Sequence, residues 1–372
     1  MNTITLRRPD DWHLHLRDGA ALRAVLPFTA ARFARAIVMP NLKPPVTTTE
    51  QALAYRRRIL DALPPGMKFE PLMTLYLTDR TDPTEIDRAL ASRQVHGCKL
   101  YPAGATTHSD AGVTDIRNIE PVLARMSELG LVLQVHGEVT DPDIDVFDRE
   151  ARFIEAILAP TVEKFARLKV VFEHITTRAA VEFVRQARAG VAATVTPQHL
   201  LMNRNALFTG GIRPHHYCLP VLKTELDRRA LLDTVASGNP RFFLGTDSAP
   251  HARHAKEAAC GCAGIFSAHA GIELYAEAFE AIGALTKLEG FASEFGADFY
   301  GLQRNAERIT LVKEPLDVPA YFPYDSAESA PAGGSLANRS VDSRSVSGPM
   351  GQLVPLRAGE RLSWRIANST GA

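Results

Sequence analysis

Short apolar runs alternate along the chain with longer amphipathic stretches. Eight runs have the length of strands and are rich in Val, Ile, Leu and Phe: residues 11–17, 35–41, 70–77, 95–101, 131–138, 169–175, 192–198 and 241–247. Between and after them, apolar positions recur at helical spacing in stretches such as 48–62, 116–129, 148–168, 224–237, 269–283 and 288–302. Thr48, followed by Gln51, and Thr177 stand where helix N-caps are expected. The pattern therefore predicts strands that are each followed by a helix.

The spacing of these strands favours a closed barrel over an open sheet. From His13 to Asp247 there are seven strand-to-strand steps of about 33 residues each, close to one βα unit. An open, doubly wound sheet normally carries a glycine-rich phosphate loop after its first strand, but that stretch reads RDGAALRAV. We therefore expect an α/β protein with a (β/α)8 TIM-type barrel and a small C-terminal extension.

The composition changes near the C-terminal end. Residues 326–351 contain seven serines and no aromatic residue, as is typical of a mobile surface segment. We expect the barrel to span residues 1–322, a Ser/Gly-rich mobile segment 323–351, and a strand-like extension 352–372 that packs on the barrel. Within the extension, QLVPLRAGERLSWRI predicts a pair of strands around Ala358 and Gly359.

Charge and composition exclude several classes of protein. Lysine plus arginine equal aspartate plus glutamate at 42 each, so no overall field favours nucleic acid or an anionic membrane. The N-terminus lacks a secretory apolar core and no run is long enough to span a bilayer, so we expect a soluble, cytoplasmic protein. Four cysteines are too few for a disulfide scaffold, and the Cys260-x-Cys262 pair is better explained by ordinary packing than by a metal site.

Polar residues with metal-binding chemistry stand at the ends of the predicted strands. In the stretch DDWHLHLRDG, strand alternation places His13, His15 and Arg17 on one face and Trp12, Leu14 and Leu16 on the other. Later strand ends carry further candidates: Asn41, Lys99, His136, His174 and Asp247. In a (β/α) barrel these ends meet at one rim, where catalytic groups sit.

Each residue also has an ordinary explanation. His136 or His174 alone is compatible with a hydrogen-bonded histidine at a strand terminus, and Arg17 with a solvated charge. Lys99 should face the barrel interior, where an unpaired ammonium is unfavourable, so a buried salt bridge to Asp247 is one interpretation. The other is that burial depresses the lysine pKa and the neutral amine reacts with CO2, which gives an anionic carbamate able to bridge two metal ions.

Seven motifs in order carry a resemblance to a known family. They are HLHLRDG at 13–19, MPN at 39–41, GCKLYP at 97–102, QVHGE at 134–138, FEHIT at 172–176, LGTDSAPH at 244–251 and VPLRAGERLSW at 354–364. Together they resemble the amidohydrolase superfamily and, within it, the shorter stand-alone dihydroorotase family of bacteria. The resemblance covers nearly all of residues 5–320.

The resemblance implies a binuclear zinc centre and a set of substrate contacts. His13, His15 and Asp247 would hold one Zn²⁺ and His136 and His174 the other, bridged by carboxylated Lys99 (N6-carboxylysine) and a hydroxide. The implied substrate contacts are Arg17, Asn41 and His251 on a carboxylate, the main chain near Leu219 and Ala263 on the ring amide, and Thr106 and Thr107 on the loop 102–113. A homodimer is implied as well.

The implied reaction is the reversible cyclisation of N-carbamoyl-L-aspartate to L-dihydroorotate in pyrimidine biosynthesis. The bridging hydroxide would be the nucleophile, and Asp247 the general acid and base. The rivals are a hydantoinase or allantoinase with the same centre, a mononuclear deaminase, which would not need Lys99, and a catalytically silent scaffold. Arg17 with Asn41 favours an anionic substrate over a neutral hydantoin.

Overall fold

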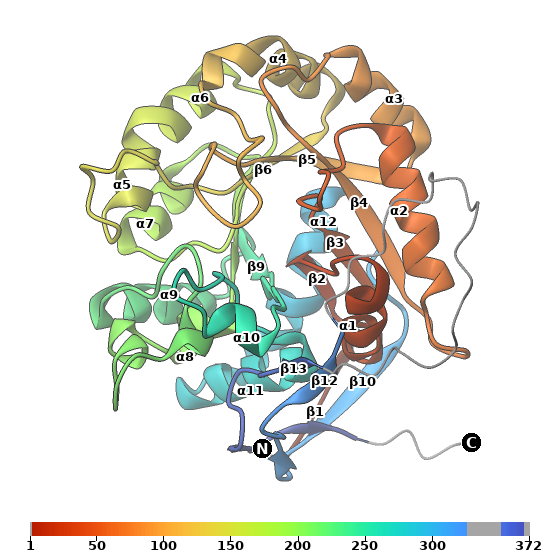
Figure 1. The fold of residues 1–372 in the computed structure, drawn as a ribbon, viewed down its shortest axis with the longest axis vertical. Helices are drawn as coiled ribbons and strands as arrows, with labels where there is room; N and C mark the ends of the chain where they lie inside the picture. Colours follow the sequence, from red (N-terminus) through yellow and green to blue (C-terminus); the bar gives the residue numbers. More distant parts are fainter. Residues whose placement is uncertain (1, 326–350, 368–372) are drawn as a thin grey trace, which may run out of the picture.

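Eight parallel strands form a barrel at the centre of the molecule (Figure 1). The computed structural model describes residues 2–325 and 351–367. The barrel strands follow one another in chain order: β2 (Asp10–Leu14), β3 (Arg35–Val38), β4 (Glu70–Tyr76), β5 (Val95–Leu100), β6 (Val132–Val135), β7 (Val170–Phe172), β8 (Val191–Val195) and β9 (Phe242–Leu244). The first and last strands, β2 and β9, meet and close the barrel. The amide of Asp247 donates to the His13 carbonyl at 2.8 Å, and the amide of His15 donates to the Ser248 carbonyl at 2.9 Å. The predicted (β/α)8 fold is confirmed.

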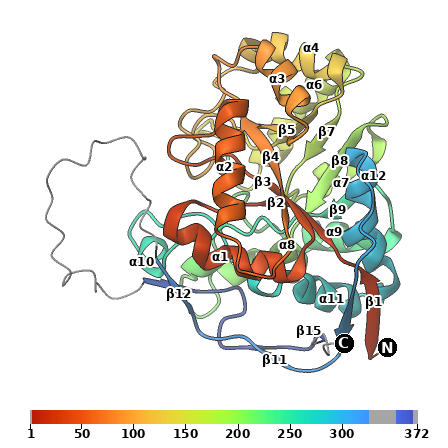
Figure 2. The ribbon, with the colours of Figure 1, turned by 90° about the vertical axis from the view of Figure 1, so that its right-hand side faces the viewer.

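Helices follow the strands and surround the barrel (Figures 1 and 2). They are α1 (Gly19–Arg32), α2 (Thr49–Asp61), α3 (Thr84–Ser92), α4 (Glu120–Leu129), α5 (Arg149–Phe153), α6 (Ala159–Lys164), α7 (Arg178–Gln186), α8 (Pro197–Leu201), α9 (Glu225–Ser237), α10 (Arg253–Lys256), α11 (Gly271–Ala281) and α12 (Phe295–Tyr300). Thr48 caps α2 in a reciprocal capping box with Gln51, and Thr177 caps α7, as predicted. Among the described residues, no helix combines the length and apolarity needed to cross a membrane.

Two predicted helices contain a wider turn. The stretch 148–168 forms α5, the π-helical turn η2 (Ile154–Leu158) and α6, and the stretch 288–302 forms the π-helical turn η7 (Gly290–Glu294) and α12. A π-helical turn adds one residue without interrupting the apolar face of the helix, so the sequence pattern predicts one continuous helix for such a stretch.

Side chains of the barrel strands alternate between the interior and the helices. One buried cluster takes a residue from most strands and fills the interior with α12: Trp12, Ile37, Met39, Leu72, Val132, Val171, Ala192, Phe243 and Ala297. The predicted face of Trp12 is wrong, since Trp12 belongs to this interior cluster whereas Leu14 and Leu16 pack with the helix-facing residues. The pairing of β2 with β3 shifts register between Asp11 and Leu14, and this irregularity interrupts simple alternation.

Helix α12 closes the interior beneath the site. Tyr300 stacks on Trp12 with ring centroids 4.7 Å apart, and its hydroxyl accepts a hydrogen bond from Gln134 Nε2 at 2.8 Å. A Cβ added to Gly296 would lie 2.0 Å from Trp12 Nε1, so this helix approaches the tryptophan as closely as only glycine permits.

Short antiparallel strands from both ends of the chain lie beside the barrel, near α1 and α11 (Figure 2). β10 (Arg308–Val312) pairs with β1 (Thr3–Arg7) and β15 (Arg365–Ile366), β11 (Leu316–Asp317) with β14 (Arg361–Leu362), and β12 (Phe322–Tyr324) with β13 (Gly351–Leu353). The predicted strand pair around Ala358 and Gly359 is therefore wrong, because both flanking strands pair with earlier segments. Most of the Ser/Gly-rich stretch, residues 326–350, lies outside the described residues, as do residues 368–372.

Candidate metal centre and pocket

The predicted ligand residues converge where the parallel strands end. Two of these residues lie within strands, His13 in β2 and Lys99 in β5. The other four follow the end of a strand by one to three positions: His15 after β2, His136 after β6, His174 after β7 and Asp247 after β9. All six are buried or nearly so, and Lys99 is fully buried. The carboxyl ends of barrel strands thus bring together residues that are up to 234 positions apart.

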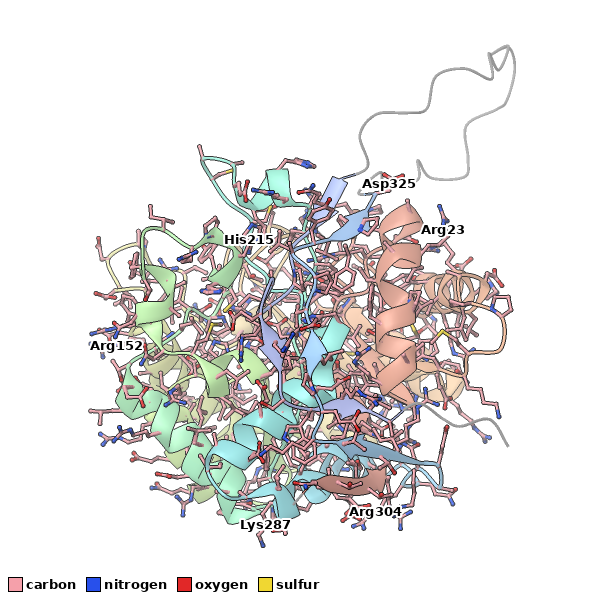
Figure 3. All side chains as sticks on the ribbon, turned by 90° about the horizontal axis from the view of Figure 1, so that it is seen from below. Arg23, Arg152, His215, Lys287, Arg304 and Asp325 are labelled. Atoms are coloured by element: carbon pink, nitrogen blue, oxygen red, sulfur yellow. The ribbon has the colours of Figure 1, made fainter. Side chains whose placement is uncertain are left out.

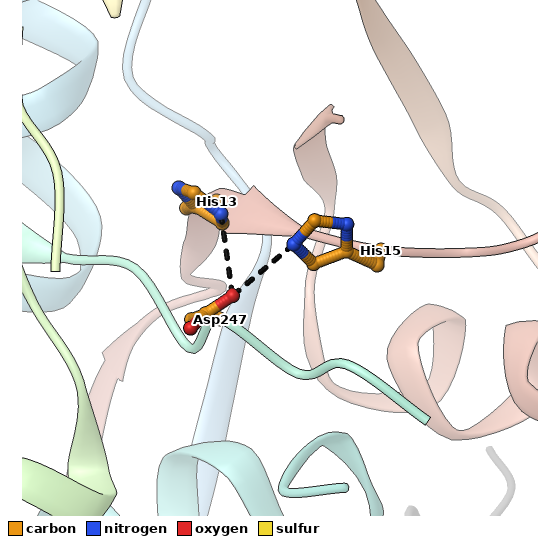
Figure 4. A group of neighbouring side chains, drawn as sticks. All are labelled: His13, His15 and Asp247. Carbon is orange, nitrogen blue, oxygen red and sulfur yellow. Dashed lines mark ion pairs between the residues drawn. The ribbon is translucent and has the colours of Figure 1, made fainter. Parts of the chain in front are cut away.

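His13, His15 and Asp247 form one compact group of donors (Figure 4). Asp247 Oδ1 lies 3.3 Å from His13 Nε2 and 3.2 Å from His15 Nε2. His15 Nδ1 lies 2.8 Å from Asn41 Oδ1, an atom that only accepts, so Nδ1 carries the proton and Nε2 keeps its lone pair. An outer hydrogen bond of this kind fixes the tautomer that a metal requires.

A second group contains a carboxylate that the sequence argument did not single out. Glu173 Oε2 lies 2.9 Å from His13 Nδ1, and Glu173 forms a donor cluster with His13 and His174. The same oxygen contacts Lys99 Nζ. The salt bridge considered between Lys99 and Asp247 is therefore wrong, since the buried partner of the ammonium is Glu173. An acidic residue inside the apolar run KVVFEHI was the available signal.

His174 connects the two histidine pairs. Its ring centroid is 4.9 Å from that of His13 and 4.9 Å from that of His136. His136 stands outside both compact donor groups, with its Nε2 2.9 Å from Glu138 Oε2. The four histidines thus form a continuous chain of rings.

Unpartnered nitrogen atoms support metal binding at this place. Both ring nitrogens of His13 and Nδ1 of His174 are buried and form no hydrogen bond among the described residues. The His13 nitrogens lie within ion-pair distance of Glu173 and Asp247, but not in hydrogen-bond geometry. Buried polar groups are normally satisfied, so orphaned imidazole nitrogens beside carboxylates need another partner. Imidazole and carboxylate donors are those that Zn²⁺ and similar ions accept. The residues therefore fit a metal cofactor.

Burial and neighbouring charges keep this group ready to bind a cation. Burial lowers the pKa of His15 to about 4 and that of His174 well below its ordinary value, so both are neutral at pH 7. Burial alone raises the pKa of Asp247, but the neighbouring imidazoles of His13 and His15 outweigh this effect and hold that pKa well below its usual range. Burial also lowers the pKa of Lys99, which favours its neutral, nucleophilic form.

Three residues at the rim have left-handed backbone conformations. Arg17, His174 and Asp247 have φ of 60°, 43° and 45°. Residues with a Cβ rarely adopt this region, and such strain concentrates at functional sites. The predicted extended alternation therefore does not reach Arg17, since β2 ends at Leu14 and a turn brings the guanidinium to the pocket.

The remaining candidates surround a pocket above the donors. Its lining includes Arg17, Asn41, Tyr101, Thr106, Thr107, Leu219, Ala249, Ala263 and Gly264 together with the four histidines and Asp247. Lys99 and His251 do not belong to this lining, but Arg17 Nη2 donates to His251 Nε2 at 2.9 Å. Asn41 Nδ2 donates to the Thr107 carbonyl at 3.3 Å, so one lining residue of the pocket holds the loop 102–113 in place.

Comparisons with known proteins agree with this geometry. The Amidohydrolase family matches residues 11–315. A dihydroorotase of Azoarcus sp. (strain BH72) is 64% identical over 99% of this chain and all of its own length, and one of Laribacter hongkongensis is 64% identical over the same shares. The chain belongs to the dihydroorotase family.

Solved structures extend the likeness to members that are more distant in sequence. A dihydroorotase of Campylobacter jejuni is 34% identical with a TM-score of 0.84, covering 98% of this chain and 97% of its own. One of Saccharomyces cerevisiae, solved with 5-fluoroorotic acid, is 32% identical with a TM-score of 0.85, covering 99% of both chains. An L-hydantoinase of Arthrobacter aurescens, 17% identical with a TM-score of 0.73 over 86% of this chain and 78% of its own, shares the fold alone.

Proposed function

We propose that the chain catalyses the reversible cyclisation of N-carbamoyl-L-aspartate to L-dihydroorotate in pyrimidine biosynthesis. The observation that carries this proposal is identity above 60% to dihydroorotases over nearly the whole chain. The chemistry of the pocket supports it, since a cluster of imidazoles and a carboxylate lies beside a guanidinium. We also propose a cytoplasmic homodimer, as the family resemblance implies, with no nucleic-acid or membrane partner.

The proposed cofactor is a pair of Zn²⁺ ions in each subunit. His13, His15 and Asp247 would hold one, and His136 and His174 the other, with carboxylated Lys99 between them. The orphaned imidazole nitrogens and the full burial of Lys99 support this assignment. When bound, the ions supply Lewis acidity that polarises an amide carbonyl and lowers the pKa of water.

Asp247 is the proposed proton carrier. In hydrolysis it takes a proton from the attacking water and delivers it to the departing ring nitrogen as the C–N bond breaks. In cyclisation it takes the proton from the carbamoyl nitrogen as that nitrogen attacks the β-carboxyl carbon, and it then returns this proton to the oxygen that leaves. With one further proton from solvent, that oxygen departs from the carboxylate as water. The low pKa of Asp247 keeps it ionised and able to accept a proton at neutral pH.

The other polar groups of the pocket orient the substrate. Arg17, with Asn41 and His251, would bind the carboxylate that does not react, since a guanidinium matches a carboxylate in geometry and charge. The main chain of Leu219 and Ala263 would recognise the amide edge. Thr106 and Thr107 would cover the substrate and exclude water.

The decisive experiment is an assay of the purified, zinc-loaded chain with carbamoyl aspartate and with dihydroorotate, in parallel with a hydantoin. We expect turnover in both directions and little reaction with the hydantoin, which lacks the carboxylate for Arg17. Preferential turnover of the hydantoin would instead assign the site to its rival activity, and inactivity on all three would indicate a silent scaffold.

A further inference from the structure

Two loops at one side of the pocket converge on a single buried lysine. Lys256, the last residue of α10, is 4% exposed. Its Nζ donates to the carbonyl oxygens of Tyr217 at 2.9 Å, Cys262 at 2.9 Å and Gly264 at 2.5 Å. An ammonium group has three N–H donors, so this arrangement uses all three on main-chain acceptors.

The lysine adds to a direct connection between these loops. One backbone bond already joins them, from the Gly264 amide to the Tyr217 carbonyl at 3.0 Å. The remaining carbonyls point toward one another, and without a cation between them their dipoles repel in a low-dielectric interior. A second tie lies at the surface, where His215 Nε2 is 3.0 Å from Glu257 Oε1, close to α10 (Figure 3).

The two tied loops form the wall of the pocket. Leu219 follows Tyr217 by two positions, and Ala263 lies between the two other acceptors; Leu219, Ala263 and Gly264 all line the pocket. There is little slack, because a Cβ on Gly264 would lie 2.6 Å from the Ala249 carbonyl oxygen.

We propose that Lys256 is a positioning residue for substrate binding, whose ammonium holds residues 217–219 and 262–264 at the separation that recognises the amide edge of the substrate. This inference rests on the proposed function, which assigns that recognition to the main chain of Leu219 and Ala263. Lys256 itself does not touch the substrate.

The charge state of this lysine makes the role observable. Burial lowers the pKa of Lys256 to about 8. Above that pH the neutral amine has two donors and a lone pair, which faces a third carbonyl, so the tie weakens. The charged and titratable groups that interact with it are Tyr217, Cys218, Cys262, Arg17, His215 and His251. At the two ends of α10, Arg253 pairs with Glu257, which also pairs with His215. Burial raises the pKa of Cys218 to about 12 and lowers those of His215 and His251, so these three groups stay neutral around pH 8.

The test measures KM and kcat for dihydroorotate from about pH 6.5 to about pH 9.5, across the lysine transition. It compares the zinc-loaded wild type with Lys256→Met, Lys256→Arg and Cys262→Ala. Lys164→Met is the matched control, since Lys164 is exposed and pairs with Glu120 on the surface. At neutral pH we expect Lys256→Met to raise KM about ten-fold, equivalent to about 1.4 kcal/mol, with kcat and zinc content nearly unchanged.

The pH profile distinguishes positioning from general structural support. The KM of the wild type and of Cys262→Ala should rise above about pH 8, whereas that of Lys256→Arg should stay flat, because a guanidinium remains charged. An unchanged KM in Lys256→Met, or the same rise above pH 8 in Lys256→Arg, would overturn the proposal.

Amide hydrogen exchange of the folded variants provides a readout that needs no activity. Compared with the wild type, Lys256→Met should exchange faster in peptides covering 217–219 and 262–264, whereas peptides from β2 and β7 should exchange at the same rate. If both loops exchange at the wild-type rate in Lys256→Met, the proposal is also overturned. A wild type that does not turn over dihydroorotate would refute the proposed function, while the exchange data would still decide whether Lys256 ties the loops.

Discussion

Glu150 is a buried carboxylate that binds the loop directly after His174, and its substitution tests how this part of the site is held in place. Glu150, in α5, is fully buried and accepts hydrogen bonds from the amide and the hydroxyl of both Thr176 and Thr177, at 2.5 to 3.1 Å. Thr176 follows His174 by two positions. Glu150 therefore fixes the loop that follows His174, one of the donors of the candidate metal centre.

The substitution Glu150→Gln keeps the shape and removes the charge. Hydrogen bonds to a charged group contribute about 1.5–3 kcal/mol and neutral ones about 0.5–1.5 kcal/mol, so each donor loses roughly 1 kcal/mol. Four donors give an upper value of roughly 4 kcal/mol. Burial raises the pKa of this carboxyl and reduces its ionised share, so we expect a loss of about 3 kcal/mol in the free energy of unfolding.

Urea unfolding at a fixed free-zinc concentration, followed by circular dichroism, measures this loss. The control is Glu155→Gln in the neighbouring turn, where the side chain is 67% exposed and pairs with Arg152. That change should alter stability by less than about 0.5 kcal/mol. Zinc should also leave Glu150→Gln faster when a chelator is added. Equal unfolding free energies for the two variants, with equal zinc loss, would refute the reasoning.

Three further changes test other parts of the site and fold. Lys99→Ala should abolish activity and reduce the zinc content, and small added carboxylates should restore part of the activity. The intact mass of the wild type should include one added CO2. One metal per chain with an unmodified lysine would contradict the proposed carboxylated Lys99. Arg17→Met should raise KM roughly 100-fold through the loss of about 3 kcal/mol of charged hydrogen bonding, with zinc content unchanged, while Arg23→Met on the exposed face of α1 (Figure 3) leaves KM as it is. Burial lowers the pKa of His269 to about 3, so only the unfolded chain takes up this proton as the pH falls below about 6.5. From pH 7 to pH 5 the wild type should therefore lose about 2 kcal/mol more stability than His269→Phe, and parallel losses in acid unfolding would exclude His269 as the cause.

The hydrophobic periodicity of the sequence was sufficient to predict the barrel fold and most of the polar residues at its rim. A strand buried on both faces is a short apolar run, so a histidine, lysine or aspartate that ends such a run stands out, and all parallel strands deliver their ends to one rim. His13, His136, His174 and Asp247 could therefore be assigned together before their contacts were known. The number of strands follows from the same pattern.

Contacts between distant segments were not readable from that pattern. The partner of Lys99 is Glu173 and not Asp247, because the choice between two nearby carboxylates depends on side-chain directions after the barrel has closed. The inward position of Trp12 depends on a register shift between β2 and β3. The C-terminal strands β13, β14 and β15 pair with β12, β11 and β10. The unpaired backbone groups at a strand edge form hydrogen bonds with the segment that the fold brings alongside, and the sequence pattern does not identify that segment.

The local sequence determined which imidazole, amine and carboxylate side chains stand at the strand ends, since periodicity and strand ends are properties of neighbouring residues. Tertiary structure alone decided which donors face one another, which carboxylate meets the buried lysine and how Lys256 joins two loops of the pocket wall. These features depend on distances between residues far apart in the chain, and only closure of the barrel sets those distances.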